Sequence, residues 1–163
     1  MATVLLSIGS NLGDRKAALQ SVVDVMPPRF TDIEVSRIFE TPPWGYTDQP
    51  AFYNAAIRAH TQLSPQDVLE FAHECEAAAA RIRDERWGPR TLDVDVITYD
   101  DVVQDDPTLT IPHPRTHERA FVLVPIADID PLFEIPGKGN VMRLLHHVDI
   151  TGIEPIGELE LPR

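Results

Sequence analysis

The chain has 163 residues, of which 43% are hydrophobic and 25% charged, a composition typical of a single soluble globular domain. Its net charge is −12, from 26 acidic and 14 basic residues, which argues against a nucleic-acid-binding surface. No apolar run approaches the roughly 20 residues of a membrane span, and one cysteine, Cys75, cannot form an internal disulfide. We therefore expect a cytoplasmic monomer with no membrane or nucleic-acid partner.

The first predicted elements are a strand and a helix joined by a glycine-containing turn. Residues 3–8 are apolar and favour a central strand. Asp14 is placed to cap a helix that we expect over residues 15–26. The intervening Gly-Ser-Asn-Leu-Gly segment, 9–13, lacks the Gly-Lys-Ser/Thr of a phosphate loop and the third glycine of a dinucleotide loop. We therefore interpret it as a structural turn.

Two strands and a long loop are expected after the double proline at 27–28, which ends this helix. Apolar residues alternate over 33–40, and 54–60 is the next candidate strand. The segment between them, 41–52, contains three prolines and three aromatic residues. Loops of this length are often functional, although an irregular ordered surface loop explains the composition equally well.

A second helix begins with a strong capping signal, Ser64 followed by Pro65. Apolar residues then recur every three or four positions and form a stripe for burial. The members of this stripe are Val68, Ala72, Cys75, Ala79 and Ile82. Because Cys75 belongs to the stripe, we interpret it as a core residue rather than a nucleophile.

The remaining predicted elements are shorter. Strands are expected over 91–99 and 108–111 and a last helix over 141–148, while the polar tail after residue 150 is expected to be peripheral. The order strand–helix–strand–strand–helix–strand predicts an α+β ferredoxin-like βαββαβ sandwich, with an antiparallel sheet and helices packed mainly on one face. We expect residues 1–163 to form one domain.

The segment from Arg86 to Val96, Arg-Trp-Gly-Pro-Arg-Thr-Leu-Asp-Val-Asp-Val, carries the strongest chemical signal. Alternate residues of a strand share a face, so Asp93 and Asp95 lie on one surface with Cα atoms about 6.5–7 Å apart. Mg²⁺ is commonly held by one or two carboxylates plus substrate phosphates. Arginine binds phosphate oxygens bidentately. The combination indicates a metal–polyphosphate site.

Each part of this motif also has a simpler interpretation. Alternating aspartates are common on the solvated face of a sheet, Arg86 and Arg90 are ordinary loop charges when taken alone, and Trp87 alone suggests packing. However, six arginines fall between positions 81 and 119 in a chain with only two lysines. This concentration favours a small anionic ligand bound locally; the alternative is a patch paired with neighbouring acidic side chains.

Taken in order, several segments closely resemble the 6-hydroxymethyl-7,8-dihydropterin pyrophosphokinase family of folate biosynthesis. They are Gly9 to Gly13, Thr41-Pro-Pro, Gln49-Pro50, Asn54-Ala-Ala, Arg81-x-Arg83, Arg86 to Asp95, Leu109 to His113 and Arg119-Ala-Phe121. The resemblance implies a Mg²⁺-dependent enzyme that transfers the pyrophosphoryl group of ATP to the hydroxymethyl group of the pterin and releases AMP.

The resemblance also implies roles on the ATP side of such a site. Asp93 and Asp95 would hold two Mg²⁺ ions, and Arg81 and Arg90 would clamp the transferred group. Asp95, or water on its metal, is the candidate acceptor of the hydroxyl proton. The implied nucleotide contacts are His73, Glu76, Arg83, Arg86, Trp87, Arg90, Val96, Thr110, His113 and Arg119.

The implied pterin pocket consists of Thr41, Pro42, Pro43, Trp44, Phe52, Asn54 and Phe121. A flat heterocycle needs aromatic faces for stacking, which Phe52 and Phe121 offer, and an amide for its polar edge, which Asn54 offers. Core packing is an equally good interpretation of Phe121 considered alone. Phe52 stands where a tyrosine often occurs in the family, so a hydroxyl is lost there.

Two other functional classes are compatible with parts of the sequence. An Asp-x-Asp pair also holds a metal in nucleotide-sugar glycosyltransferases, which usually need a longer, doubly wound domain. A ferredoxin-like interaction domain would use the acidic surface to bind protein partners, but it leaves the arginine–tryptophan turn unexplained. Release of AMP in the presence of the pterin alcohol separates the first class from a pyrophosphokinase, and the second class predicts no stabilisation by ATP.

Overall fold

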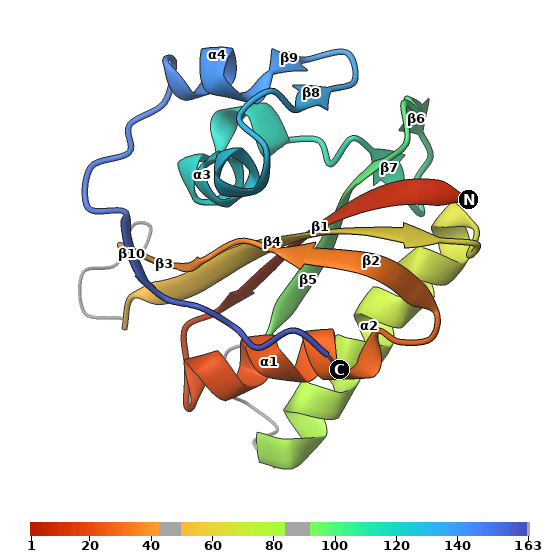
Figure 1. Cartoon of the computed structure of the whole chain (residues 1–163), viewed down its shortest axis with the longest axis vertical. Coiled ribbons are helices and arrows are strands. Elements are labelled where there is room, and N and C mark those ends of the chain that lie inside the picture. The colour runs from red at the N-terminus through yellow and green to blue at the C-terminus, as the bar shows by residue number, and fades with distance from the viewer. Residues whose placement is uncertain (43–49, 84–91, 163) are drawn as a thin grey trace.

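The computed structural model describes residues 1–42, 50–83 and 92–162, and its centre is an antiparallel sheet (Figure 1). The strand order is β10-β3-β4-β1-β5, with β2 also paired to β4. The strands of this sheet are β1 (Ala2–Ser10), β2 (Phe30–Val35), β3 (Ile38–Thr41), β4 (Phe52–Thr61), β5 (Asp93–Tyr99) and β10 (Glu154–Gly157). Helix α1 (Arg15–Val25) follows β1 and helix α2 (Pro65–Arg83) follows β4. This arrangement is the predicted ferredoxin-like sandwich.

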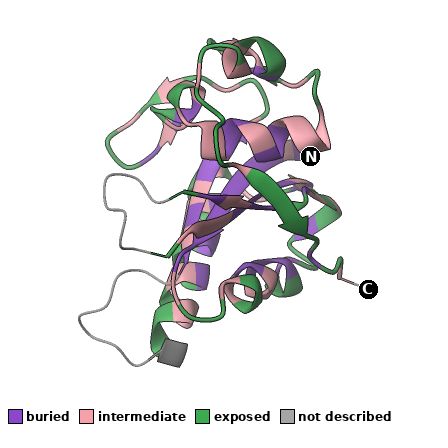
Figure 2. Ribbon diagram, turned by 90° about the vertical axis from the view of Figure 1, so that its left-hand side faces the viewer, coloured by how far each residue is buried: buried purple, intermediate pink, exposed green. Residues whose placement is uncertain are grey.

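Side chains from alternate positions of the sheet build two cores, one on each face. Figure 2 shows that many residues of the strands at the middle of the molecule are buried. The larger core lies between the sheet and the two long helices and contains Leu6. The smaller core contains Leu5 from the sheet and Leu123 from α3 (Ala120–Ile129), with α4 (Val141–Leu145) packed beyond it. The sheet therefore has α1 and α2 on one face and α3 on the other.

The two long helices begin at the predicted caps. Asp14 Oδ1 accepts a hydrogen bond from the backbone N–H of Ala17 at 3.0 Å, and Ser64 Oγ accepts one from Asp67 N–H at 3.2 Å. Each cap satisfies an N–H group that has no partner inside its helix. In the predicted stripe of α2, Val68, Ala72 and Cys75 are buried. The core interpretation of Cys75 is confirmed.

The predicted single strand over 33–40 is wrong, because β2 and β3 are separate strands that pair with opposite ends of β4. Between them, Ser36 donates its N–H to the Ala56 carbonyl at 2.9 Å, and Ser36 Oγ accepts from Ala56 N–H at 2.9 Å. A side-chain oxygen thus replaces a backbone acceptor where the strand is interrupted. The chain can bend at this point without leaving the Ala56 N–H unpaired.

Arg37, the next residue at this interruption, ties the sheet to the far end of α3. Its backbone N–H donates to Asp128 Oδ2 at 2.8 Å. Its guanidinium Nε and Nη2 donate to Asp128 Oδ1 at 3.1 Å and 2.9 Å. Three hydrogen bonds therefore join the interruption between β2 and β3 to the last turn of the helix.

Helix α3 itself is missing from the predicted elements, because its segment is apolar on nearly every side and contains Pro125. The last helix is shorter than expected and ends at Leu145. The expected strand over 108–111 is reduced to two residues. The remaining short elements are β6 (Gln104–Asp105), β7 (Thr110–Ile111), the 3₁₀ turn η1 (Thr116–Glu118), β8 (Glu134–Ile135) and β9 (Gly139–Asn140).

The C-terminal segment is more closely integrated than the expected peripheral tail. Strand β10 pairs with β3, with Glu154 opposite Glu40, and Leu159 is only 8% exposed in the larger core. Gln20 Nε2 donates to the Glu160 carbonyl at 2.8 Å, and Glu160 N–H donates back to Gln20 Oε1 at 2.9 Å. The segment therefore extends the sheet and then closes the core beside α1.

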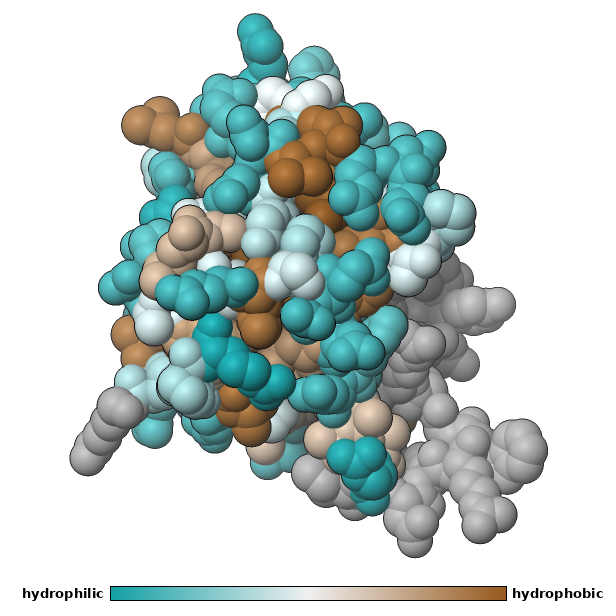
Figure 3. Space-filling model, turned by 90° about the vertical axis from the view of Figure 1, so that its right-hand side faces the viewer, coloured by the Kyte–Doolittle hydropathy of each residue, from teal (hydrophilic) through white to brown (hydrophobic). Residues whose placement is uncertain are grey.

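Hydrophilic side chains predominate on the face of the molecule drawn in Figure 3, and smaller apolar areas lie between them. Exposed apolar residues include Val103 and Leu132, which belong to turns outside the main sheet. In the described part of the chain, none of the helices has the length and apolar character needed to cross a lipid bilayer.

Candidate functional site

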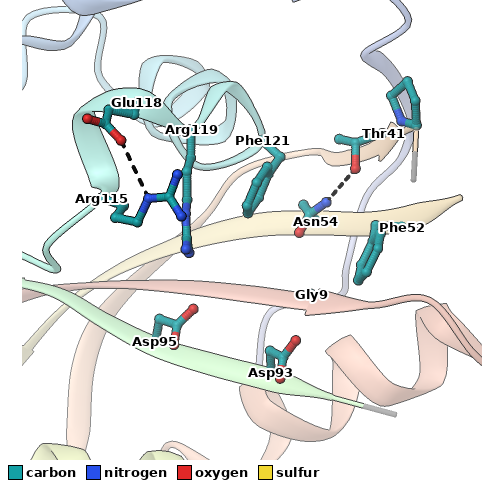
Figure 4. Close-up of a pocket in the computed structure, with 11 residues that line it drawn as sticks. Gly9, Thr41, Phe52, Asn54, Asp93, Asp95, Arg115, Glu118, Arg119 and Phe121 are labelled. Carbon is teal, nitrogen blue, oxygen red and sulfur yellow. Dashed lines mark hydrogen bonds and ion pairs between the residues drawn. The ribbon is translucent and has the colours of Figure 1, made fainter. Parts of the chain in front are cut away.

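A pocket of about 340 Å³ opens on the face of the sheet that carries α3 (Figure 4). Its walls come from segments far apart in the sequence: strands β1, β4 and β5, the end of β3, and the segment that leads through η1 into α3. The lining residues are Gly9, Thr41, Pro42, Phe52, Asn54, Asp93, Asp95, Arg115, Glu118, Arg119 and Phe121.

Asp93 and Asp95 form an acid pair on one side of β5, as the alternation predicted. The valines at positions 94 and 96 are 4% and 3% exposed and point into the larger core. Because these valines anchor the strand, the two carboxylates face the opposite side, and Figure 4 shows both directed toward the side of the pocket where Arg119 lies. The acid pair is thus held by the packing of its neighbours.

Helix α2 adds a second restraint on the acid pair. Glu76 Oε2 accepts a hydrogen bond at 3.0 Å from the backbone N–H of Val94, the residue between the two aspartates. The bond fixes β5 against the helix at this position. Glu76, predicted as a nucleotide contact, therefore supports the strand beneath the pocket.

His113 lies beside the acid pair, with Nε2 3.9 Å from Asp95 Oδ1. Burial lowers the pKa of His113, Arg119 lowers it further, and Asp95 opposes both effects. A lowered pKa favours the neutral form of the imidazole beside Asp95.

The other end of the pocket, which we call the aromatic end, consists of Thr41, Phe52, Asn54 and Phe121. The buried Asn54 Nδ2 donates to Thr41 Oγ1 at 2.8 Å. Figure 4 shows Asn54 with the rings of Phe52 and Phe121 on either side of it. An amide edge between two aromatic rings is suited to a flat, polar heterocycle.

Gly9 joins the aromatic end to the acid pair, because in the sheet it pairs with Asn54 on one side and Asp93 on the other. A Cβ atom at this position would lie 2.6 Å from Asn54 Oδ1, closer than real contacts allow. The glycine therefore makes room for the Asn54 amide. The interpretation of this segment as only a structural turn missed this role, which depends on a residue across the sheet.

Arginine side chains lie above the acid pair. Arg119 lines the pocket with its guanidinium carbon 5.7 Å from the centre of the Phe121 ring. Arg115 also lines it, and its Nε donates to Glu118 Oε2 at 3.5 Å. Arg115 and Glu118 were not among the predicted contacts, although Arg115 belongs to the arginine cluster that the sequence revealed.

The structure brings most, but not all, of the described candidates together. The predicted residues that line the pocket are Thr41, Pro42, Phe52, Asn54, Asp93, Asp95, Arg119 and Phe121. Val96 is buried in the core, so its side chain is not available to a ligand, and Thr110 Oγ1 donates to the Asp106 carbonyl at 3.3 Å. His73 and Arg81 are exposed on α2.

Several candidates lie outside the described residues, so their placement is not part of the site geometry. They are Pro43, Trp44, Arg86, Trp87 and Arg90, together with the side chain of Arg83.

The chemistry of the pocket fits magnesium bound with a phosphate ligand. Within the described ranges, no group of three or more His, Cys, Asp or Glu side chains could hold a metal ion. An ion held by the two carboxylates of the acid pair would keep positions for oxygens of a ligand or water, which is the usual way in which Mg²⁺ binds beside phosphates.

The fold and the site together define a ferredoxin-like α+β protein with a small-molecule pocket between its sheet and α3. The sequence model of the 7,8-dihydro-6-hydroxymethylpterin-pyrophosphokinase (HPPK) family matches residues 5–131, and the chain belongs to this family.

Curated relatives match over nearly the whole chain. A protein of Methylorubrum extorquens is 42% identical over 158 residues, which cover 96% of this chain and 99% of the relative. A protein of Pseudomonas aeruginosa is 36% identical and covers 93% of this chain and 94% of the relative. Both are named 2-amino-4-hydroxy-6-hydroxymethyldihydropteridine pyrophosphokinase.

Solved structures agree on the fold. The HPPK-DHPS of Plasmodium falciparum, wild type with pteroate, has a TM-score of 0.68 at 12% identity and matches 90% of this chain and 44% of its own. An HPPK-DHPS in complex with substrates has a TM-score of 0.70 at 12% identity, and the match covers 90% of this chain and 44% of that protein. This chain spans less than half the length of these two proteins.

Proposed function

We propose that this chain transfers the pyrophosphoryl group of ATP to the hydroxymethyl oxygen of 6-hydroxymethyl-7,8-dihydropterin and releases AMP. The family and the names of its relatives make it a pyrophosphokinase of folate biosynthesis. The main support for this proposal is that the aromatic end and the acid pair line the same pocket.

The pterin would bind at the aromatic end. Phe52 and Phe121 provide faces for the fused ring, and Asn54 provides an amide for its polar edge. The bond from Asn54 to Thr41 fixes the orientation of that amide before the ligand arrives. Stacking at Phe52 does not need the hydroxyl that a tyrosine would carry.

The triphosphate of ATP would bind at the acid pair with two Mg²⁺ ions, held by Asp93 and Asp95. Bound Mg²⁺ supplies positive charge that neutralises the phosphate oxygens. Arg119 lies over the same part of the pocket and would bind phosphate oxygens directly. Arg81, near the end of α2, and Arg90 would bind the pyrophosphoryl group during its transfer.

Asp95, or water on its metal, would also accept the proton of the attacking hydroxyl group. Its carboxylate lines the pocket, and the pKa of its neighbour His113 is lowered by burial. Proton transfer to a carboxylate requires hydrogen-bond reach, which binding at the aromatic end would provide.

An AMP-release assay tests the proposed reaction. We expect AMP to form only when ATP, Mg²⁺ and the pterin alcohol are all present, and to disappear with EDTA or when the pterin is omitted. Formation of ADP would identify a simple kinase instead, and AMP without pterin would identify a hydrolase. Either result would overturn the proposal.

The Asp95→Asn variant tests the acid pair, with Asp105→Asn as the matched control because Asp105 is exposed on β6, outside the pocket. We expect AMP release to fall about 100-fold or more in the first variant, because it removes charge from the reacting centre. The control should keep wild-type activity. Near-normal turnover of Asp95→Asn with metal bound would rule out its catalytic role.

The two alternative functions account for less of the structure. A doubly wound glycosyltransferase domain needs parallel strands, whereas the pairings described for the main sheet are antiparallel. An interaction domain does not require an acid pair and an aromatic amide site in one pocket. Thermal stabilisation by MgATP distinguishes it, because an interaction domain gains none.

A further inference from the structure

The C-terminal segment approaches the wall of the pocket where Gly152 meets Pro42. We propose that Gly152 is a positioning residue for the pterin, because its turn sets the place of Pro42 in the pocket wall. This inference rests on the proposed function and adds a residue from a segment outside the part of the chain that the family model matches.

The contact leaves no room for a side chain at Gly152. A Cβ atom there would lie 2.8 Å from Pro42 Cγ and 3.5 Å from Pro42 Cδ. The backbone φ of Gly152 is +83°, in the region that favours glycine. Pro42 in turn lines the pocket. The proline ring is therefore in contact with Gly152 and also forms part of the pocket wall.

The turn that presents Gly152 is well defined. Ile153 N–H donates to the Ile150 carbonyl at 3.1 Å, which places Gly152 at the third position of a four-residue turn. A positive φ at this position is typical of a type II turn. Asp149 Oδ1 accepts from the Thr151 N–H at 2.9 Å and from Thr151 Oγ1 at 2.6 Å, which holds the start of the turn.

Strand pairing fixes this turn beside the pocket. Glu154 of β10 lies opposite Glu40 of β3, and the strands are antiparallel. Continuing the register by two residues places Gly152 opposite Pro42, which is the contact observed. Figure 1 shows β10 next to β3 at one edge of the sheet. The sheet therefore sets the position of the contact.

Displacement of Pro42 should affect the aromatic end of the pocket more than the acid pair. Pro42 follows Thr41, whose hydroxyl is bonded to the Asn54 amide, so displacement of Pro42 alters the aromatic end. The acid pair is on β5, at the opposite edge of the sheet from β10. An added Cβ at Gly152 should therefore weaken pterin binding and spare ATP binding.

The test compares Gly152→Ala with Gly137→Ala. Gly137 also has a positive φ, +74°, but a Cβ there would meet nothing within 4 Å, so it controls for backbone strain. We expect the Kd of 6-hydroxymethyl-7,8-dihydropterin, measured by fluorescence titration, to rise about tenfold in Gly152→Ala, because small misplacements of a binding wall have large effects. The KM for ATP should stay within about twofold of wild type, and Gly137→Ala should bind pterin normally.

A second pair of variants isolates the contact. Alanine at position 42 lacks the Cγ and Cδ atoms that a Cβ at position 152 would meet. In a Pro42→Ala background, Gly152→Ala should therefore cause no further loss of pterin affinity. If Gly152→Ala alone is too unstable to assay, recovery of folding in the double variant supports the contact, and failure to recover overturns it.

The outcomes separate this inference from the function on which it rests. Equal pterin affinities of Gly152→Ala and Gly137→Ala would overturn the positioning role while wild type still binds pterin and releases AMP. If wild type neither binds pterin nor releases AMP, the proposed function fails instead.

Discussion

At the scale of single residues, the aromatic end depends on the absence of a side chain at Gly9. The neighbouring amide of Asn54 is buried and bonded to Thr41, so it has little freedom to withdraw. Gly9 matters because it has no Cβ atom, and a substitution there tests the geometry of the pocket directly.

We expect Gly9→Ala to raise the KM for pterin by about tenfold or more, because the new Cβ would lie 2.6 Å from Asn54 Oδ1. Steady-state kinetics with each substrate varied in turn measures this effect. Gly157→Ala is the control, because a Cβ there meets nothing within 4 Å. A wild-type pterin KM in Gly9→Ala would show that the close approach is not needed.

Cys75 illustrates a residue made unreactive by its surroundings. Burial raises the pKa of its thiol from the ordinary value of 9.0 to about 11. Since the thiolate is the reactive form, we expect slow modification by a thiol reagent at pH 8 in the native protein and fast modification in denaturant. Absorbance of the released chromophore measures both rates. Equal rates would contradict the buried, protonated thiol.

The same shift gives a direction for stability against pH. Because the pKa of the Cys75 thiol is higher in the folded than in the unfolded state, its contribution to stability is fully present at low pH and is lost at high pH. The free energy of unfolding should therefore fall as the pH rises from the ordinary value of 9.0 toward about 11. Urea denaturation of wild type and Cys75→Ala across this range measures the contribution, and only wild type should show this part of the decrease.

At the scale of elements, the bond from Glu76 to Val94 N–H links α2 to β5 directly beneath the acid pair. We expect Glu76→Ala to lower the free energy of unfolding by about 1–2 kcal/mol, because it leaves a backbone donor without its partner. Glu76→Gln keeps an acceptor oxygen and should restore most of the loss. Urea denaturation measures both variants, and equal stability of Glu76→Ala and wild type would argue against the link.

The elements that could be predicted are those with local causes. The caps at Asp14 and Ser64 and the apolar spacing in α2 are readable from neighbouring residues, and the structure confirms them. The alternation of aspartate and valine likewise placed the acid pair on one face of β5.

The elements that could not be predicted depend on distant partners. The split near Ser36 depends on hydrogen bonds to Ala56, and β10 exists because β3 lies beside it. Helix α3 is apolar on nearly all sides, so it has no period to detect. The same holds for the site, since the role of Gly9 appears only once Asn54 lies opposite.

At the scale of the whole molecule, the last residues close the larger core. Leu159 is 8% exposed within that core, whereas Leu161, two residues later, is 57% exposed. We expect Leu159→Ala to lower the free energy of unfolding by about 2–4 kcal/mol, through lost burial and the cavity left behind. Leu161→Ala should change it by less than about 0.5 kcal/mol.

Chemical denaturation of both leucine variants provides the comparison. Similar midpoints for the two would mean that the C-terminal residues are not part of the core. A large decrease in the free energy of unfolding that occurs only in Leu159→Ala would establish that residues after β10 are needed to complete the core.

The three hydrogen bonds between Arg37 and Asp128 have a consequence for which molecules the pocket admits. They fasten the far end of α3 to the sheet, while Phe121 at the near end lies over the pocket. These bonds help to hold the helix that carries Phe121 in place beside the sheet. We therefore expect the pocket to favour planar molecules that stack on this ring over molecules with groups that project out of their plane.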